Sequence, residues 1–199
     1  EPLHNFIAIQ KSLEILTHPL SFNLGPKNIT LSTVGLIDHL EKFEMLPKVN
    51  LAFSLHAANQ ALRETIIPSA KNNPLSQIMA TLDRIHQSGH KFITFEYTLI
   101  AEINDQDWHV DELISLLEER KHYALLNLIP LNPFKGLTWQ KPSPERIEYI
   151  RQKLVANGIR TFQRKTQGSD ILAACGQLKP ASIMALQEKK PTLKTVNGQ

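Results

Sequence analysis

The sequence has only one cysteine, Cys175, among 199 residues. A single thiol excludes an internal disulfide framework and any four-cysteine zinc or iron–sulfur site built from this chain alone. No apolar run approaches the roughly 18 to 20 residues of a membrane-spanning helix. The longest run, Ala124 to Leu131, is short and is interrupted by Asn127. The first residues also lack the basic and apolar regions of a signal peptide. We expect a cytoplasmic, monomeric protein that binds no membrane.

The 22 basic and 19 acidic residues are unevenly distributed along the chain. Residues 1–145 contain 12 basic and 16 acidic side chains, whereas residues 146–199 contain 10 basic and 3 acidic ones. A basic segment of this kind favours an anionic partner such as RNA, because lysine and arginine neutralise phosphates and release counterions. A solvated basic surface followed by a frayed basic tail is the alternative interpretation.

Segments with the period of a helix alternate with segments with the period of a strand. The pattern predicts strands over residues 28–33, 49–55, 92–100, 123–129 and 159–164. It predicts helices over residues 3–16, 35–43, 73–89, 104–117 and 143–158. We expect Asn73 to cap the third helix and Gly89 to end it, with Asn104 or Asp105 capping the fourth. The buried stripe expected in the third helix is Leu75, Ile78, Met79, Leu82 and Ile85.

Apolar strands separated by amphipathic helices are typical of a parallel sheet covered by helices. The regular spacing of the strand and helix units predicts an α/β fold, namely a (β/α) barrel or an open portion of one. In such folds the functional residues gather at the carboxyl ends of the strands. The sequence places Ser32, Ser54, His56, Asn132 and Arg164 near those ends.

Ser54 and His56 stand two residues apart at the end of a strongly apolar strand, so an extended backbone would place both side chains on one side. A hydroxyl or a neutral imidazole there could hold the ribose or the carboxylate of a ligand. Asn132 offers an amide group suited to a nucleoside. The alternatives are a structural histidine and a turn asparagine before Pro133.

The segment around Cys175 combines Gly168, which permits a left-handed turn, Ser169 or Asp170 as a helix cap, and Gly176 as a helix end. This pattern places Cys175 near the carboxyl end of a short helix, where the helix dipole disfavours a thiolate. Nearby cations or a cationic cofactor would be needed to activate the thiol. A small buried side chain is the alternative interpretation.

Five segments of the chain are distinctive when they are taken in order. They are residues 1–3 (EPL), 29–35 (ITLSTVG), 53–57 (FSLHA), 127–134 (NLIPLNPF) and 168–178 (GSDILAACGQL). Together they resemble the RlmN/Cfr family of radical S-adenosylmethionine RNA methyltransferases. The last segment is close to a signature by itself. The resemblance covers residues 1–179, so we expect a barrel portion that includes the cysteine loop over residues 1–179 and a basic tail over residues 180–199.

The resemblance implies a partial parallel (β/α) barrel of the radical S-adenosylmethionine type that lacks its N-terminal β/α units. It implies S-adenosylmethionine and a [4Fe–4S] cluster as cofactors, and methylation of an adenine carbon in 23S ribosomal RNA and in tRNA. Pro2 and the segment from Pro130 to Pro133 resemble the branch that acts on carbon 2 rather than carbon 8. In this family a cysteine carries the methyl group, a 5′-deoxyadenosyl radical activates it, and a second cysteine resolves the protein–RNA adduct through a disulfide.

The resemblance also implies roles for individual residues. Cys175 resembles the cysteine that carries the methyl group, and Glu1 resembles the glutamate that binds the amino group of S-adenosylmethionine. The other residues at cofactor-contacting positions of the family are Ser32, Ser54, Leu55, His56 and Asn132. From charge and position, rather than from the resemblance, we expect Arg164 and Lys165 to contact RNA phosphates.

Several parts of the family's machinery are missing from the sequence. The three-cysteine loop that binds the cluster, the resolving cysteine and the acid/base glutamate all lie upstream of the family motif that Glu1 and Pro2 match. One cysteine cannot supply three ligands, so we expect that the chain is a fragment and is inactive alone. The alternatives are an RNA-binding remnant without catalysis, carbon-8 specificity, and an unrelated barrel enzyme with Cys175 and His56 as nucleophile and base.

Overall fold

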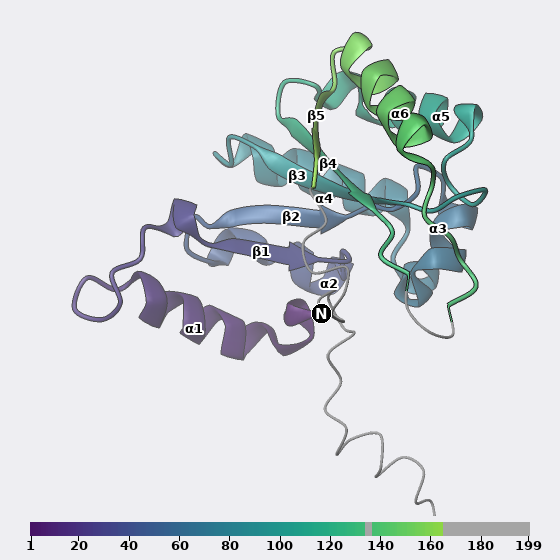
Figure 1. Cartoon of the computed structure of the whole chain (residues 1–199). Coiled ribbons are helices and arrows are strands. Elements are labelled where there is room, and N and C mark those ends of the chain that lie inside the picture. Colours follow the sequence, from purple (N-terminus) through teal and green to yellow (C-terminus); the bar gives the residue numbers. More distant parts are fainter. Residues whose placement is uncertain (134–136, 165–199) are drawn as a thin grey trace, which may run out of the picture.

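The central feature of the computed structural model, which describes residues 1–133 and 137–164, is a parallel sheet. Its five strands lie side by side in the order of the sequence, and every neighbouring pair is parallel (Figure 1). They are β1 (Thr30–Thr33), β2 (Asn50–Ser54), β3 (Ile93–Leu99), β4 (Ala124–Pro130) and β5 (Arg160–Gln163). A sheet whose strand order never reverses is the arrangement of a (β/α) barrel. The predicted parallel α/β fold is confirmed.

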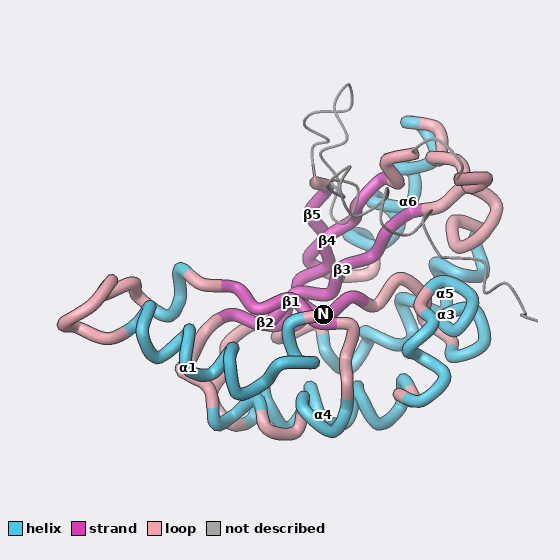
Figure 2. Tube along the Cα trace, turned by 90° about the horizontal axis from the view of Figure 1, so that it is seen from below, coloured by secondary structure: helices cyan, strands magenta, loops and turns pink. Residues whose placement is uncertain are grey.

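The helices of the described residues alternate with these strands. They are α1 (Phe6–Thr17), α2 (Ile37–Leu40), α3 (Gln60–Ile66), α4 (Leu75–Gln87), α5 (Asp107–Leu117) and α6 (Pro144–Ala156). Figure 2 shows α1, α3, α4 and α5 on one side of the strands. The sequence pattern did not predict α3. No helix in the part of the chain that the structure describes is long and apolar enough to cross a membrane.

Burial alternates along the two longest strands. In β3 the residues Ile93, Phe95, Tyr97 and Leu99 are buried, whereas the residues between them are half-buried, and β4 shows the same alternation. The buried side chains pack with the helices into one core that runs from Leu3 to Ile159. The helices that were predicted to cover the sheet therefore lie on one face of its described part. We call the other face, which carries Glu96, the inner face.

Helix α4 has the predicted buried stripe but not the predicted cap. Leu75, Ile78, Met79, Leu82 and Ile85 are all buried. The N-cap is Pro74 rather than Asn73. The side chain of Asn73 serves another turn, since its Oδ1 accepts a hydrogen bond from the Ile37 N–H at 2.9 Å and its Nδ2 donates to the Ser69 carbonyl at 2.8 Å. Asn73 therefore joins the start of α2 to the loop before α4.

Helix α5 is capped by Gln106, which forms a capping box with His109, so the predicted cap at Asn104 or Asp105 is wrong. The Asn104 side chain is fully buried, and its Oδ1 accepts a hydrogen bond from the Ile100 N–H at 2.8 Å. Its Nδ2 donates to the carbonyls of His56, at 2.9 Å, and Thr98, at 2.7 Å. Asn104 therefore binds the end of β3 to the segment that follows β2.

The predicted start of α6 is confirmed. The Ser143 side chain accepts a hydrogen bond from the Arg146 N–H at 3.2 Å, and Pro144 occupies the first turn. The predicted range ended at residue 158, and Gly158, just after this helix, has a φ of 79°, the left-handed conformation common after a helix end. The expected boundary between residues 179 and 180 lies outside the described residues.

Candidate active site

Polar side chains gather on the inner face near the carboxyl ends of β1 and β2 and at the middle of β3. The parallel register places Ser54 beside Glu96, and Glu96 beside Asn127. Ser32 on β1 pairs with Ala52 on β2. Because Ala52 is small, a longer side chain from β3 can cross β2 above it and reach Ser32. The sheet therefore brings together Ser32 and Ser54, which were predicted site residues. It adds Glu96 and Asn127, which were not.

Glu96 is the residue that joins the two serines. Its Oε2 accepts a hydrogen bond from Ser32 Oγ at 3.0 Å and lies 3.5 Å from Ser54 Oγ, at the outer limit of a hydrogen bond. No ion pair within the described residues involves Glu96. Glu96 is not among the predicted site residues, because those residues stand at the predicted strand ends. The available signal was one acidic side chain in the middle of an apolar strand.

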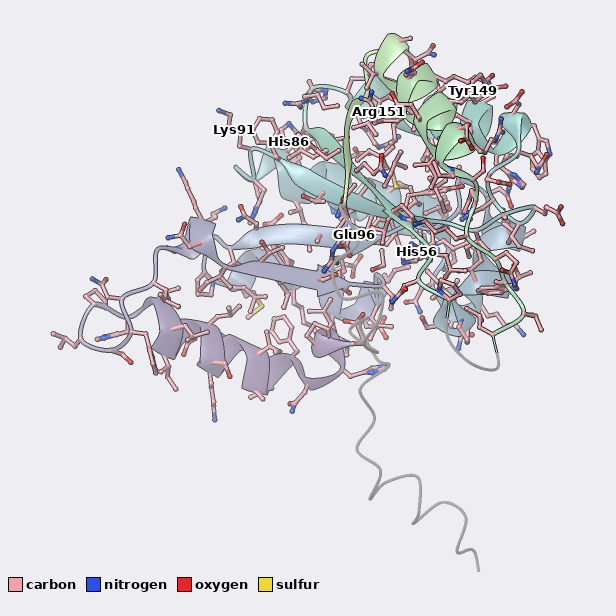
Figure 3. The ribbon with its side chains drawn as sticks, viewed as in Figure 1. His56, His86, Lys91, Glu96, Tyr149 and Arg151 are labelled. Atoms are coloured by element: carbon pink, nitrogen blue, oxygen red, sulfur yellow. The ribbon has the colours of Figure 1, made fainter. Side chains whose placement is uncertain are left out.

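The side chain of His56 extends the hydrogen-bond ladder between β2 and β3. Figure 3 labels His56 together with Glu96. Strand β2 ends at Ser54, and His56 has a φ of 56°, in the left-handed region. Its N–H donates to the Glu96 carbonyl at 3.2 Å, and its Nδ1 accepts a hydrogen bond from the Thr98 N–H at 3.0 Å. The expected extended backbone from Ser54 to His56 is therefore wrong, because the chain turns after Ser54.

The bond to Nδ1 decides which nitrogen of the His56 ring carries the proton. A backbone N–H can only donate, so Nδ1 is unprotonated and the neutral ring carries its proton on Nε2. Burial, together with the positive charge of Arg63, lowers the pKa of His56 to about 4. Near neutral pH His56 is therefore uncharged. Its Nε2–H has no acceptor within the described residues and is available to a ligand.

Arg63 is fully buried at the carboxyl ends of β1 and β2. Its Nη2 donates to the carbonyls of Val34, at 2.6 Å, and Ser54, at 3.1 Å, and its Nε donates to that of Leu55 at 3.1 Å. The guanidinium carbon lies 5.0 Å from the centre of the Phe53 ring. Burial lowers its pKa to about 10, which leaves a cation at neutral pH. Arg63 therefore fixes the backbone that carries Ser54.

The carboxylate of Glu1 binds groups at the end of β1. Its Oε1 accepts hydrogen bonds from the Leu3 N–H at 2.8 Å and from Thr33 Oγ1 at 3.0 Å. Its Oε2 accepts a hydrogen bond from the Val34 N–H at 2.7 Å. All three donors are neutral, and they hold the carboxylate near the strand end that also carries Ser32.

The structure describes three of the remaining candidates. Asn132 follows β4 and is half-buried, Leu55 follows β2 and is fully buried, and Arg164 is exposed just after β5. Lys165 and Cys175 lie outside the described residues. Their proposed roles stay predictions.

No family model matches the chain, but its sequence is similar to those of curated RNA methyltransferases. The probable dual-specificity RNA methyltransferase RlmN 2 of Protochlamydia amoebophila is 41% identical over 202 residues, which are 98% of this chain and 54% of that protein. The dual-specificity RNA methyltransferase RlmN of Francisella tularensis is 42% identical over 179 residues, or 89% of this chain and 48% of that protein. The chain spans about half the length of the curated relatives it matches.

Solved structures give the same result for the fold. A radical SAM methyltransferase from Sphaerobacter thermophilus matches with a TM-score of 0.84 and 39% identity over 89% of this chain and 52% of that one. A domain of pyruvate-formate lyase-activating enzyme from Bacteroides vulgatus shares the fold, with a TM-score of 0.59 at 16% identity. The expected partial barrel is therefore confirmed. Sequence similarity and fold together show that the chain belongs to the RlmN family of radical S-adenosylmethionine methyltransferases.

Proposed function

We propose that this chain is part of an enzyme that methylates carbon 2 of adenine in RNA, with S-adenosylmethionine as the methyl donor. We propose 23S ribosomal RNA and tRNA as its substrates. The observation that carries the proposal is the 41 to 42% identity to dual-specificity RNA methyltransferases over 89 to 98% of this chain. The resemblance of Pro2 and of the segment from Pro130 to Pro133 to the carbon-2 branch supports the choice of carbon.

The chemistry of the inner face fits S-adenosylmethionine. This ligand combines ribose hydroxyls and an ammonium group with a cationic sulfonium. The described residues offer acceptors at Glu96 and Ser32, and a donor at Nε2 of His56. The Glu1 carboxylate could bind the ammonium group. We propose that the ligand is held by Glu1, Ser32, Ser54, the backbone of Leu55, His56 and Asn132.

A [4Fe–4S] cluster does not fit this chain by itself. Such clusters are held by cysteine thiolates, and the sequence contains a single cysteine. Within residues 1–133 and 137–164 no group of three histidine, cysteine or acidic side chains could hold a metal ion. We propose that the ligands of the cluster come from outside these 199 residues.

A protein thiol solves a chemical difficulty of the proposed reaction. Carbon 2 of adenine is electron-poor and does not displace a methyl group from a sulfonium, whereas a thiolate is a strong nucleophile. We propose that Cys175 Sγ forms a bond to the methyl carbon as the bond from that carbon to the sulfonium breaks. A neutral His56 suits this step, because its Nε2–H can donate to the ligand without repelling the sulfonium charge.

The role of Cys175 can be tested in the whole protein that contains this chain, with its cluster reconstituted. We expect Cys175→Ala to lose methylated RNA below detection, because the variant lacks the thiol proposed to accept the methyl group. Mass spectrometry of RNA nucleosides measures the product and separates carbon 2 from carbon 8. Mass spectrometry of the parent protein should also find an added methyl group on Cys175.

As a matched control, Ser12→Ala on the exposed side of α1 should retain full activity. Product from Cys175→Ala at the parent rate would contradict the proposal.

RNA binding without catalysis is a second candidate function, favoured by the 10 basic and 3 acidic residues of the segment 146–199. In that case RNA affinity should fall steeply, by about a thousandfold or more, between about 50 and 200 mM salt if six or more phosphates are contacted. A salt-independent affinity would argue against it. Detection of methylated adenine made by the purified protein would exclude a purely binding role.

A further inference from the structure

The Glu96 cluster on the inner face, formed by Glu96, Ser32 and Ser54, presents hydrogen-bond acceptors. The Ser32 hydroxyl donates its proton to Glu96 Oε2 at 3.0 Å, so the lone pairs of the serine oxygen remain free. The Ser54 hydroxyl lies 3.5 Å from the same Oε2. The other carboxylate oxygen, Oε1, accepts no hydrogen bond from the residues that the structure describes. The cluster therefore presents mainly hydrogen-bond acceptors to a ligand, and the weakly held Ser54 proton is its one donor.

An acceptor cluster with a negative charge selects the kind of group that can bind there. Carboxylates and phosphates are excluded, because they bring negative charge and no proton to donate. From the sequence, two ligand groups were possible for Ser54 and His56, a ribose and a carboxylate. The negative charge of Glu96 excludes the carboxylate and leaves the ribose. Within the described residues, no protein cation forms an ion pair with Glu96. The charge of the Glu96 carboxylate is therefore available to the ligand.

A vicinal diol fits this position better than an ammonium group. The neighbouring His56 presents an Nε2–H donor, and its own N–H is bonded to the Glu96 carbonyl at 3.2 Å. A ribose hydroxyl can donate to a carboxylate and accept from an imidazole, whereas an ammonium group has no lone pair and can only donate. A carboxylate paired with ribose hydroxyls is also the arrangement by which dinucleotide-binding folds recognise their ligands.

On the basis of the function proposed above, we propose that Glu96 is a specificity-determining residue that accepts hydrogen bonds from the ribose hydroxyls of S-adenosylmethionine. In this arrangement Ser32 and Ser54 hold the carboxylate in position, and Ala52 leaves room for it to cross β2. The active site would then distinguish a ribose from a deoxyribose ligand.

The test pairs a change in the protein with a change in the ligand, in the whole protein with its cluster reconstituted and no reductant present. Dissociation constants are measured by equilibrium dialysis for S-adenosylmethionine and for its 2′-deoxy and 3′-deoxy analogues. We expect the parent to bind at least one deoxy analogue roughly 10- to 100-fold more weakly, as for the loss of a hydrogen bond to a charged group. We expect Glu96→Gln to bind S-adenosylmethionine at least roughly 10-fold more weakly and to distinguish the analogues much less.

Controls separate this role from a structural one. Glu41→Gln removes the same charge from an exposed ion pair with Arg84 and should retain the parent's discrimination. A Glu96→Gln variant that binds all three ligands more weakly by the same factor would show a structural role and overturn the inference. Equal affinity of the parent for all three ligands would overturn it even if Glu96→Gln failed to fold.

The outcomes also separate this inference from the proposed function. A parent protein that binds S-adenosylmethionine and methylates RNA but does not distinguish the deoxy analogues would refute the role of Glu96 alone. A parent protein that binds no S-adenosylmethionine would refute both. Ser32→Ala gives a further check, because loss of the donor to Oε2 should weaken the discrimination without removing the charge.

Discussion

At the scale of single residues, the imidazole of His56 takes the place of a backbone group. Strand β2 ends at Ser54, yet the Thr98 N–H of β3 still needs an acceptor, which Nδ1 of His56 supplies at 3.0 Å. This bond requires the unprotonated nitrogen and a left-handed backbone, with a φ of 56°. From the sequence, both a structural and a functional role were possible for His56. In the structure, Nδ1 has the structural role and Nε2–H is available to a ligand.

Burial and the charge of Arg63 lower the pKa of His56, and this makes stability depend on pH. The pKa of His56 is lowered to about 4 in the folded chain, while an unfolded histidine titrates near its usual 6.5. Between these values the unfolded chain binds more protons, so the contribution of His56 to stability is complete above pH 6.5 and is lost as the pH falls toward 4. We expect the unfolding free energy of the parent to fall more between pH 7 and 5 than that of His56→Asn.

Asparagine is the matched replacement for His56. Its side-chain oxygen can accept from the Thr98 N–H, it tolerates a left-handed backbone better than most residues, and it does not titrate. Burial also lowers the pKa values of His90 and His109, but these residues are present in both proteins and their effects cancel in the difference. Urea unfolding at pH 7, 6 and 5 measures that difference. Parallel pH curves would show that His56 does not titrate as described.

At the scale of elements, the turn from β1 into α2 depends on a glycine. Gly35 has a φ of 84°, and a Cβ atom there would lie 2.8 Å from Phe53 Cε2 and 2.9 Å from Ile78 Cδ1. Both neighbours belong to the buried core, where β2 and α4 pack together. The close approach leaves the turn no space for a side chain.

We expect Gly35→Ala to destabilise the chain by about 2 to 4 kcal/mol, from the left-handed backbone and the overpacked contact together. Gly25→Ala is the matched control, because Gly25 has a φ of −58° and its added Cβ would come no closer than 3.4 Å to Asn28 Nδ2. It should change stability by no more than about 0.5 kcal/mol. Thermal and urea unfolding of both variants measure the effect. Similar stabilities for the two alanine variants would contradict this account of the turn.

At the scale of the whole molecule, a single core joins strands β1 through β4 and the helices that cover them. The buried cluster includes residues from Leu3, before α1, to Ile159, before β5, and it contains side chains of β1 through β4. No separate core divides the described residues into independent parts. The molecule should therefore fold and unfold as a unit.

We expect one cooperative unfolding transition in urea. Far-UV circular dichroism follows the helices, and tryptophan fluorescence follows Trp108 on α5 and Trp139 before α6. Both signals should give the same midpoint, as required for two-state behaviour. Two separated midpoints would show that the α5 and α6 region unfolds independently and would contradict a shared core.

The sequence by itself determined the class of fold and most of its elements. The stripe of α4, the cap of α6 and the order of strands and helices follow from periodicity and from local cap residues. These signals lie within a few residues of one another, so they can be recognised without knowing the tertiary structure. The five family segments, taken from the sequence, likewise indicated the family that the comparisons show.

Only the tertiary structure decided the partners of the polar side chains. Glu96 meets Ser32 from a strand 64 residues away, and Arg63 meets Val34 from 29 residues away. Asn73 was predicted to cap its own helix but bonds the N–H of Ile37 instead. A polar group binds whichever partner the neighbouring strands and turns place beside it, and that neighbourhood arises only when the sheet assembles.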